Sequence, residues 1–88
     1  MALILIAVTL TANTSYAEKK YTAQELYSKG QKIEDTNPKK ALEFYYKAIK
    51  LDEKYKLAYK EAGWVEGTVF NNFKKGYKLV GTSIEIDN

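Results

Sequence analysis

The sequence predicts an all-α protein made of two tandem antiparallel helical hairpins. Three observations support this: apolar residues recur at intervals of three and four, start signals precede two of the segments, and the pattern repeats after 33–35 residues. The chain has 88 residues, enough for one small domain.

Residues 1–17 contain no charged side chain, whereas all the charges of the chain lie from Glu18 onward. The apolar run Ala2–Leu10 is too short to span a bilayer, which needs about 20 residues. Ser15-Tyr16-Ala17 provides a small-x-small site, so residues 1–17 are predicted to be a secretory signal cleaved near Ala17. No lysine precedes the apolar run, which leaves open a true start upstream of Met1. A buried N-terminal helix or strand is the other alternative.

The first hairpin is indicated by two helix-start signals. Thr22 and Glu25 have the spacing of a capping box, which predicts a helix from Ala23 to about Asp35. Asn37-Pro38 is the second signal, because asparagine caps well and proline is tolerated in the first helical turn. The connection between the two helices is short, so they are expected to be antiparallel neighbours.

The second helix, predicted to end near Leu51-Asp52, has the clearest apolar face. This face contains Ala41, Leu42, Tyr45, Ala48 and Ile49. Lysines and Glu43 occupy much of the remaining surface.

The second hairpin is predicted from two further segments. A helix over 54–65 has the small stripe Ala58, Ala62 and Val65, which would allow a close approach to a neighbour. A helix over 72–86 has Phe73, Tyr77, Val80 and Ile84 on one face. Residues 82–86 also alternate as a short strand would, but the helical spacing covers more residues.

The repeat has the period and the residue types of a known family. Leu26, Gly30 and Ile33, followed by Ala41, Tyr45 and Ala48, match the two-helix core of the tetratricopeptide repeat (TPR), which the sequence resembles. The weaker second copy contains Tyr59, Ala62-Gly63, Gly76, Val80 and Ser83. The inter-helix spacings, 11 and 13 residues, depart from the family's twelve in opposite directions. The expected TPR-like domain covers 18–88, with repeats at about 22–53 and 54–88.

The resemblance implies a protein-interaction module whose first helices line a concave groove. The groove positions carried over from the family are Gln24, Tyr27, Gln31, Glu34, Leu57, Lys60, Trp64 and Thr68. The expected partner is a protein or a peptide. Since about three repeats are normally required for stability, the two repeats here leave three interpretations open: part of a longer array, a module completed by a partner, or a self-associating domain.

Catalysis is not expected. The chain has no histidine and no cysteine, and the adjacent pairs Glu34-Asp35 and Asp52-Glu53 lie at helix ends, where their carboxylates diverge. No cofactor, metal site or stable membrane span is predicted. The use of lysine in place of arginine and the style of the signal are typical of a bacterial protein exported to the periplasm or the medium.

The remaining class is a lysine-rich binder of an anionic cell-envelope polymer. The 14 basic residues favour it, but 11 acidic residues are interleaved among them and arginine is absent. Nucleic acid is not an expected partner, because arginine is the preferred reader of phosphates and guanine edges.

Overall fold

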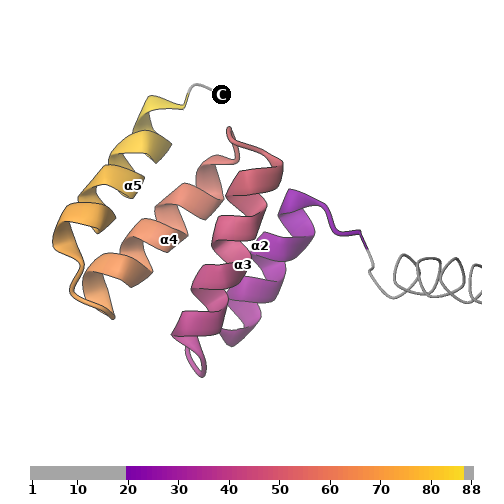
Figure 1. Cartoon of the computed structure of the whole chain (residues 1–88), viewed down its shortest axis with the longest axis horizontal. Coiled ribbons are helices and arrows are strands. Elements are labelled where there is room, and N and C mark those ends of the chain that lie inside the picture. Colours follow the sequence, from indigo (N-terminus) through magenta and orange to yellow (C-terminus); the bar gives the residue numbers. More distant parts are fainter. Residues whose placement is uncertain (1–19, 87–88) are drawn as a thin grey trace, which may run out of the picture.

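The computed structural model describes residues 20–86, which form four α-helices and no strand within that range. The helices are α2 (Ala23–Ile33), α3 (Pro38–Leu51), α4 (Lys56–Thr68) and α5 (Phe73–Glu85). Each helix packs against the next along the chain, so the helices form a row from α2 to α5 (Figure 1). This arrangement confirms the all-α class and the two tandem hairpins. The predicted signal, residues 1–17, lies outside the described residues.

The two predicted helix-start signals both form their expected hydrogen bonds. The Thr22 hydroxyl accepts from the Glu25 amide at 3.1 Å, and the Thr22 amide donates to the Glu25 carboxylate at 2.9 Å. At α3, the Asn37 side chain accepts from the Lys40 amide at 3.1 Å and Pro38 is the first helical residue. These caps satisfy amide groups that the first turn of a helix leaves unpaired.

The observed α4 is shifted toward the C-terminus of the predicted segment 54–65. The Asp52 carboxylate accepts from the Lys54 amide and its carbonyl accepts from the Tyr55 amide, both at 3.0 Å. Because of this turn, α4 begins at Lys56. At the other end Gly67 does not stop the helix, and the chain turns at Asn71, whose φ is 59°.

The region that could have been a strand, residues 82–86, is helical as far as Glu85. Ser83 is buried, and its hydroxyl donates to the Val80 carbonyl at 2.7 Å. The other buried residue of α5 is Gly76. These two small residues lie seven positions apart, two helical turns, so they share one face and allow α5 to lie close to α4.

The core combines four alanines with larger side chains, among which Tyr45 is fully buried; its members are Leu26, Tyr27, Ala41, Leu42, Tyr45, Ala48, Ala58, Ala62 and Val65. A Cβ atom at Gly30 would lie 2.6 Å from the Tyr45 ring, and one at Gly63 would lie 2.7 Å from Val80 Cγ2. Each hairpin therefore has a glycine on its first helix against a larger side chain on its second. The sequence repeat is thus visible in the packing.

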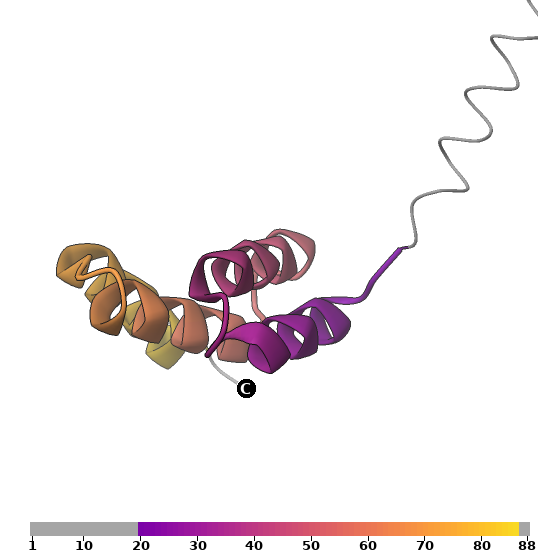
Figure 2. The same ribbon diagram turned by 90° about the horizontal axis from the view of Figure 1, so that it is seen from below.

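The first helices of the two hairpins lie on the same side of the molecule. Viewed from below, α3 lies above the level of α2 and α4 (Figure 2). The rings of Tyr27 on α2 and Tyr55 at the start of α4 are 5.6 Å apart, in an edge-to-face arrangement. The two hairpins are therefore joined by contacts of both α2 and α3 with α4.

Candidate functional site

An apolar groove runs between α4 and α5. Its volume is about 330 Å³, and it is lined by Gly63, Trp64, Gly67, Thr68, Phe73, Gly76, Tyr77 and Val80. The glycines leave its floor without side chains. A Cβ atom at Gly63 would lie 2.9 Å from the Gly76 carbonyl oxygen, which shows how closely the two helix backbones approach. The close approach thus creates a shallow depression between larger side chains.

Aromatic side chains border this groove and are mostly exposed. The exposed fractions are 60% for Trp64, 62% for Phe73 and 81% for Tyr77. Rigid aromatic rings provide a large contact area for little loss of conformational entropy on binding, which is why they dominate the energetics of protein interfaces. The chemistry available here is apolar contact and the hydrogen bonds of the indole N–H and the phenol.

The aromatic border continues along α5 as an apolar stripe. Phe73, Tyr77, Val80 and Ile84 lie on one face, as the spacing predicts, and Ile84 is 74% exposed. We call Phe73, Tyr77 and Ile84 the α5 stripe. It lies beside the face that packs on α4 and is not buried by it. Exposed contiguous apolar surface of this kind marks interaction sites on small proteins.

The groove positions expected on α4 all lie at the surface. Leu57, Lys60, Trp64 and Thr68 are exposed, and Trp64 and Thr68 line the observed groove. The Thr68 hydroxyl already donates to the Trp64 carbonyl at 2.7 Å. Trp64 is therefore the largest exposed side chain that α4 contributes to the groove.

The positions expected on α2 are in a different environment. Tyr27 is buried, with its ring 5.7 Å from that of Tyr45. Glu34 is half-buried and accepts from the Tyr45 hydroxyl at 2.5 Å. Gln24 and Gln31 are exposed, and Gln24 belongs to a polar depression that also involves Ser28. The structure thus does not bring the α2 positions together with Trp64 in the apolar groove.

A pair of carboxyl groups joins α2 and α4 beside Tyr45. Burial raises the pKa of Glu61, and its hydrogen bond and repulsion with the Glu34 carboxylate raise it further. Burial, followed by the bond to Glu34, also raises the pKa of the Tyr45 hydroxyl. These groups link α2, α3 and α4 beside the buried ring of Tyr45.

A second buried carboxylate, Glu66, joins α3, α4 and α5. It accepts hydrogen bonds from the Tyr46 hydroxyl and, at 2.8 Å, from Asn72 Nδ2, and Lys75 Nζ lies 3.3 Å away. Burial alone would raise the pKa of Glu66, but the bonds from Asn72, Tyr46 and Lys75 outweigh it and lower the pKa. Glu66 is therefore a carboxylate that is ionised at neutral pH, and its hydrogen-bond and ion-pair partners belong to the same fold.

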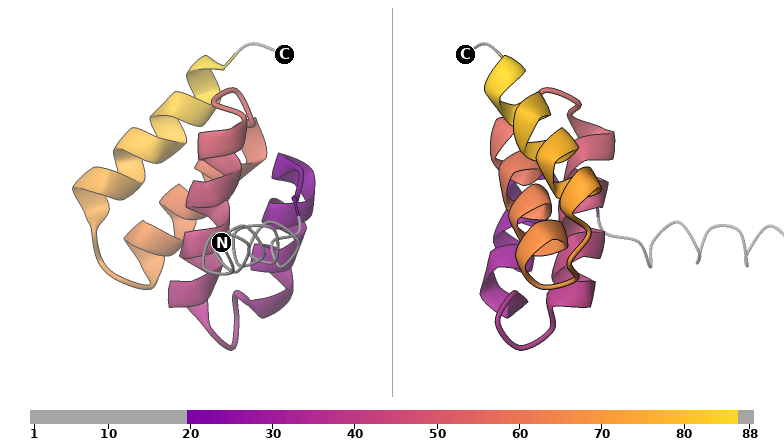
Figure 3. Two further views of the ribbon diagram at one scale, coloured as in Figure 1. Left: turned by 45° about the vertical axis from the view of Figure 1, so that its right-hand side comes forward. Right: turned by 90° about the vertical axis from the view of Figure 1, so that its left-hand side faces the viewer.

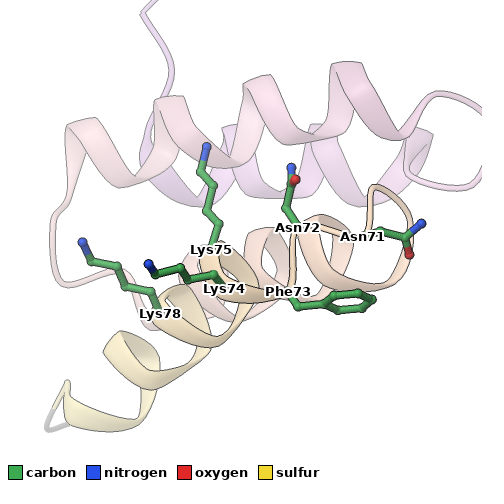
Figure 4. A pocket seen from close by; sticks show the side chains of 6 residues that line it. All are labelled: Asn71, Asn72, Phe73, Lys74, Lys75 and Lys78. Carbon is green, nitrogen blue, oxygen red and sulfur yellow. The ribbon is translucent and has the colours of Figure 1, made fainter.

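Three lysines lie near the start of α5. Lys75 and Asn72 point toward α3, whereas Phe73 points to the other side (Figure 4). Lys75 is engaged by Glu66, and its ammonium lies 5.1 Å from the centre of the Tyr46 ring. Lys74, Lys75 and Lys78 are all exposed, but Lys75 is paired with Glu66, so two lysines of this group have no carboxylate partner within residues 20–86.

Sequence reasoning identified Trp64 but not the α5 residues as site candidates. The signal for Phe73 and Tyr77 was present as an apolar stripe, and such stripes normally pack inward.

Among residues 20–86 no group of three or more carboxylates could hold a metal ion. No helix in the same part of the chain is long and apolar enough to cross a bilayer.

Comparison with known protein families gives no match. Searches of curated proteins and of solved structures likewise give none.

Proposed function

We propose that the chain is a TPR-type protein-interaction module that binds a protein or peptide and performs no catalysis. The observation that carries this proposal is the exposure of Trp64, Phe73 and Tyr77 around one apolar groove. The hairpin arrangement and the repeated glycine contacts support the TPR interpretation. The binding residues are Trp64, Phe73 and Tyr77, with Leu57 and Thr68 beside them on α4.

The proposed mechanism is apolar contact with a preformed surface. The groove floor is fixed by the α4–α5 backbone contact, so little ordering is required when a partner binds. An apolar or aromatic side chain of the partner would lie over Gly67 and between the rings of Trp64 and Tyr77. Specificity would come from exposed polar groups at the edge of the surface, including Lys60.

Selection from a displayed peptide library on the purified chain tests this proposal. Selected peptides are expected to bind the wild type and Leu51→Ala, a control on α3 whose side chain is 59% exposed. Trp64→Ala and Tyr77→Ala should each weaken binding by about 1–2 kcal/mol or more, as truncation of interface aromatics does. Because Trp64 is the only tryptophan of the chain, its emission should shift to shorter wavelength when a peptide binds.

Two outcomes would contradict the proposal. Peptides whose affinity is the same for the wild type, Trp64→Ala and Tyr77→Ala would place binding elsewhere. Binding only to anionic polymers, lost by moderate salt and by Lys74→Ala with Lys78→Ala, would favour the polymer-binding alternative.

We also propose that the chain is exported and cleaved near Ala17, on the basis of the uncharged segment 1–17 and its small-x-small site. Intact-mass measurement of the protein recovered from the periplasm or medium of a bacterial host should give a chain that starts at Glu18. Retention of the full chain in the cytoplasm would contradict export.

A further inference from the structure

The two second helices of the hairpins have different numbers of neighbours. Among the described helices, α3 packs extensively against both α2 and α4, whereas α5 packs extensively only against α4 and reaches α3 through Lys75, which lies beside the Tyr46 ring. Figure 3 shows α5 at the end of the row, with α4 on one side. One face of α5 is therefore uncovered where the corresponding face of α3 is covered.

The repeat identifies the residues of this uncovered face. A shift of 35 positions, which places Ala41 on Gly76, also places Leu42 on Tyr77 and Ile49 on Ile84. Leu42 is 9% exposed and Ile49 is half-buried against the core, while Tyr77 and Ile84 are 81% and 74% exposed. Two of the three residues of the α5 stripe, Tyr77 and Ile84, thus occupy positions whose counterparts in the first hairpin are buried or half-buried.

The opposite end of the row does not complement this stripe. The exposed side of α2 has a polar depression lined by Tyr21, Gln24, Glu25, Ser28, Lys29 and Lys32. Stacking the α5 of one copy on the α2 of another would bury these charged groups against apolar side chains, which is unfavourable. Pairing of two α5 helices buries apolar surface against apolar surface.

The charges beside the stripe define the direction of such a pair. Lys74 and Glu85 are 11 residues apart, so they lie within about 20° of each other around the helix axis, at opposite ends of α5. Both are exposed, and neither forms an ion pair within residues 20–86. In an antiparallel pair, Lys74 of each copy lies beside Glu85 and the carbonyl end of the other α5, where a cation is favourable. In a parallel pair, Lys74 of one copy would lie at the opposite end from Glu85 of the other, and this attraction would be absent.

We infer that the partner of the α5 stripe is a second copy of this chain, paired antiparallel about a two-fold axis. The inference rests on the proposed function, because it names the occupant of the same protein-binding surface. In this pair Phe73 of one copy contacts Ile84 of the other, and Tyr77 lies near the axis. The stripe exposes on the order of 350 Å² per copy, below the roughly 800 Å² of a standard interface. The pair is therefore expected to be weak and to form only at high protein concentration.

Sedimentation equilibrium of the full chain, from low to several hundred micromolar, tests the pairing. The wild type is expected to be a monomer and dimer in concentration-dependent equilibrium. Ile84→Lys and Tyr77→Lys should each weaken the dimer at least tenfold, while Leu51→Lys, a matched change at an exposed leucine of α3, should leave it unchanged. Far-ultraviolet circular dichroism confirms that each variant is folded.

Charge reversal tests the antiparallel direction. Lys74→Glu and Glu85→Lys should each weaken the dimer several-fold, and the double variant should restore it. A folded wild type that stays monomeric at all concentrations would overturn the inference, as would a dimer insensitive to Ile84→Lys. A double variant that dimerises no better than the singles would overturn the antiparallel arrangement.

The test of self-pairing can be separated from the test of peptide binding, because Ile84 does not line the α4–α5 groove. A monomer that still binds selected peptides through Trp64 and Tyr77 would overturn self-pairing and leave the proposed function in place. If the stripe variants change neither self-pairing nor peptide binding, both proposals fail.

Discussion

Gly63 lies where α4 and α5 come closest. A Cβ atom there would be 2.7 Å from Val80 Cγ2 and 2.9 Å from the Gly76 carbonyl oxygen, a backbone atom that does not move freely. Gly63→Ala is therefore expected to destabilise the fold by about 1–3 kcal/mol, as other over-packed sites do. Urea unfolding followed by circular dichroism measures the effect.

Gly81 is the matched control, because a Cβ atom added there would have no neighbouring atom within 4 Å. Gly81→Ala should stabilise the fold by up to about 1 kcal/mol, since alanine is the better helix former. A neutral Gly63→Ala would contradict the close packing of α4 on α5, and a destabilising Gly81→Ala would contradict the open space beside Gly81.

The pKa values of Glu66 and Glu61 are shifted in opposite directions, so the two residues should change the stability of the fold in opposite ways as the pH changes. The pKa of Glu66 is lowered from its usual 4.5 in the fold, so its stabilising contribution is present above pH 4.5 and is lost as the pH falls through the folded value. The pKa of Glu61 is raised, so its contribution is present below pH 4.5 and is lost as the pH rises through the folded value.

Urea unfolding between pH 3 and pH 7 tests these signs. Glu66→Gln should cost about 1–3 kcal/mol at pH 7, because it removes the partner of Lys75, and the cost should shrink at acidic pH. Glu61→Gln should be neutral or stabilising at pH 7, where it relieves the repulsion from Glu34. A cost of Glu66→Gln that is independent of pH would show that the carboxylate charge does not contribute.

At the scale of single helices, the starts of α2 and α3 could be predicted because capping is encoded within four residues. The start of α4 could not, since it depends on a turn in which Asp52 binds two later amides. The end of α5 is ambiguous in the sequence, because residues 82–86 alternate as a short strand would and also continue the helical spacing. In the structure these residues are helical as far as Glu85, and Ser83 is buried.

The candidate site was only partly predictable from helical spacing. Trp64 stands outside the stripe of Ala58, Ala62 and Val65, so its exposure follows from position alone. The burial of Tyr27 depends on Tyr55, which lies 28 positions away in the chain, and spacing within one helix carries no information about such a contact. The exposure of Tyr77 depends on α5 having one neighbour, which is also a property of the whole arrangement.

At the scale of the whole molecule, the row of helices has two unlike ends. The α5 end is apolar, with Ile84 and Tyr77 exposed, and the α2 end carries lysine and glutamate beside glutamine and serine. Repeat arrays are soluble when their terminal helices present polar outer faces. Among the described helices, α2 therefore has the polar kind of outer face and α5 has the apolar kind.

The polar face of α2 also limits how far association proceeds. Among the described helices, the α2 surface that stays outside a pair of α5 helices carries charged and amide side chains, to which the apolar stripe of another copy is not complementary. Contacts between that stripe and α2 are therefore not expected to extend the pair into filaments as the protein concentration increases.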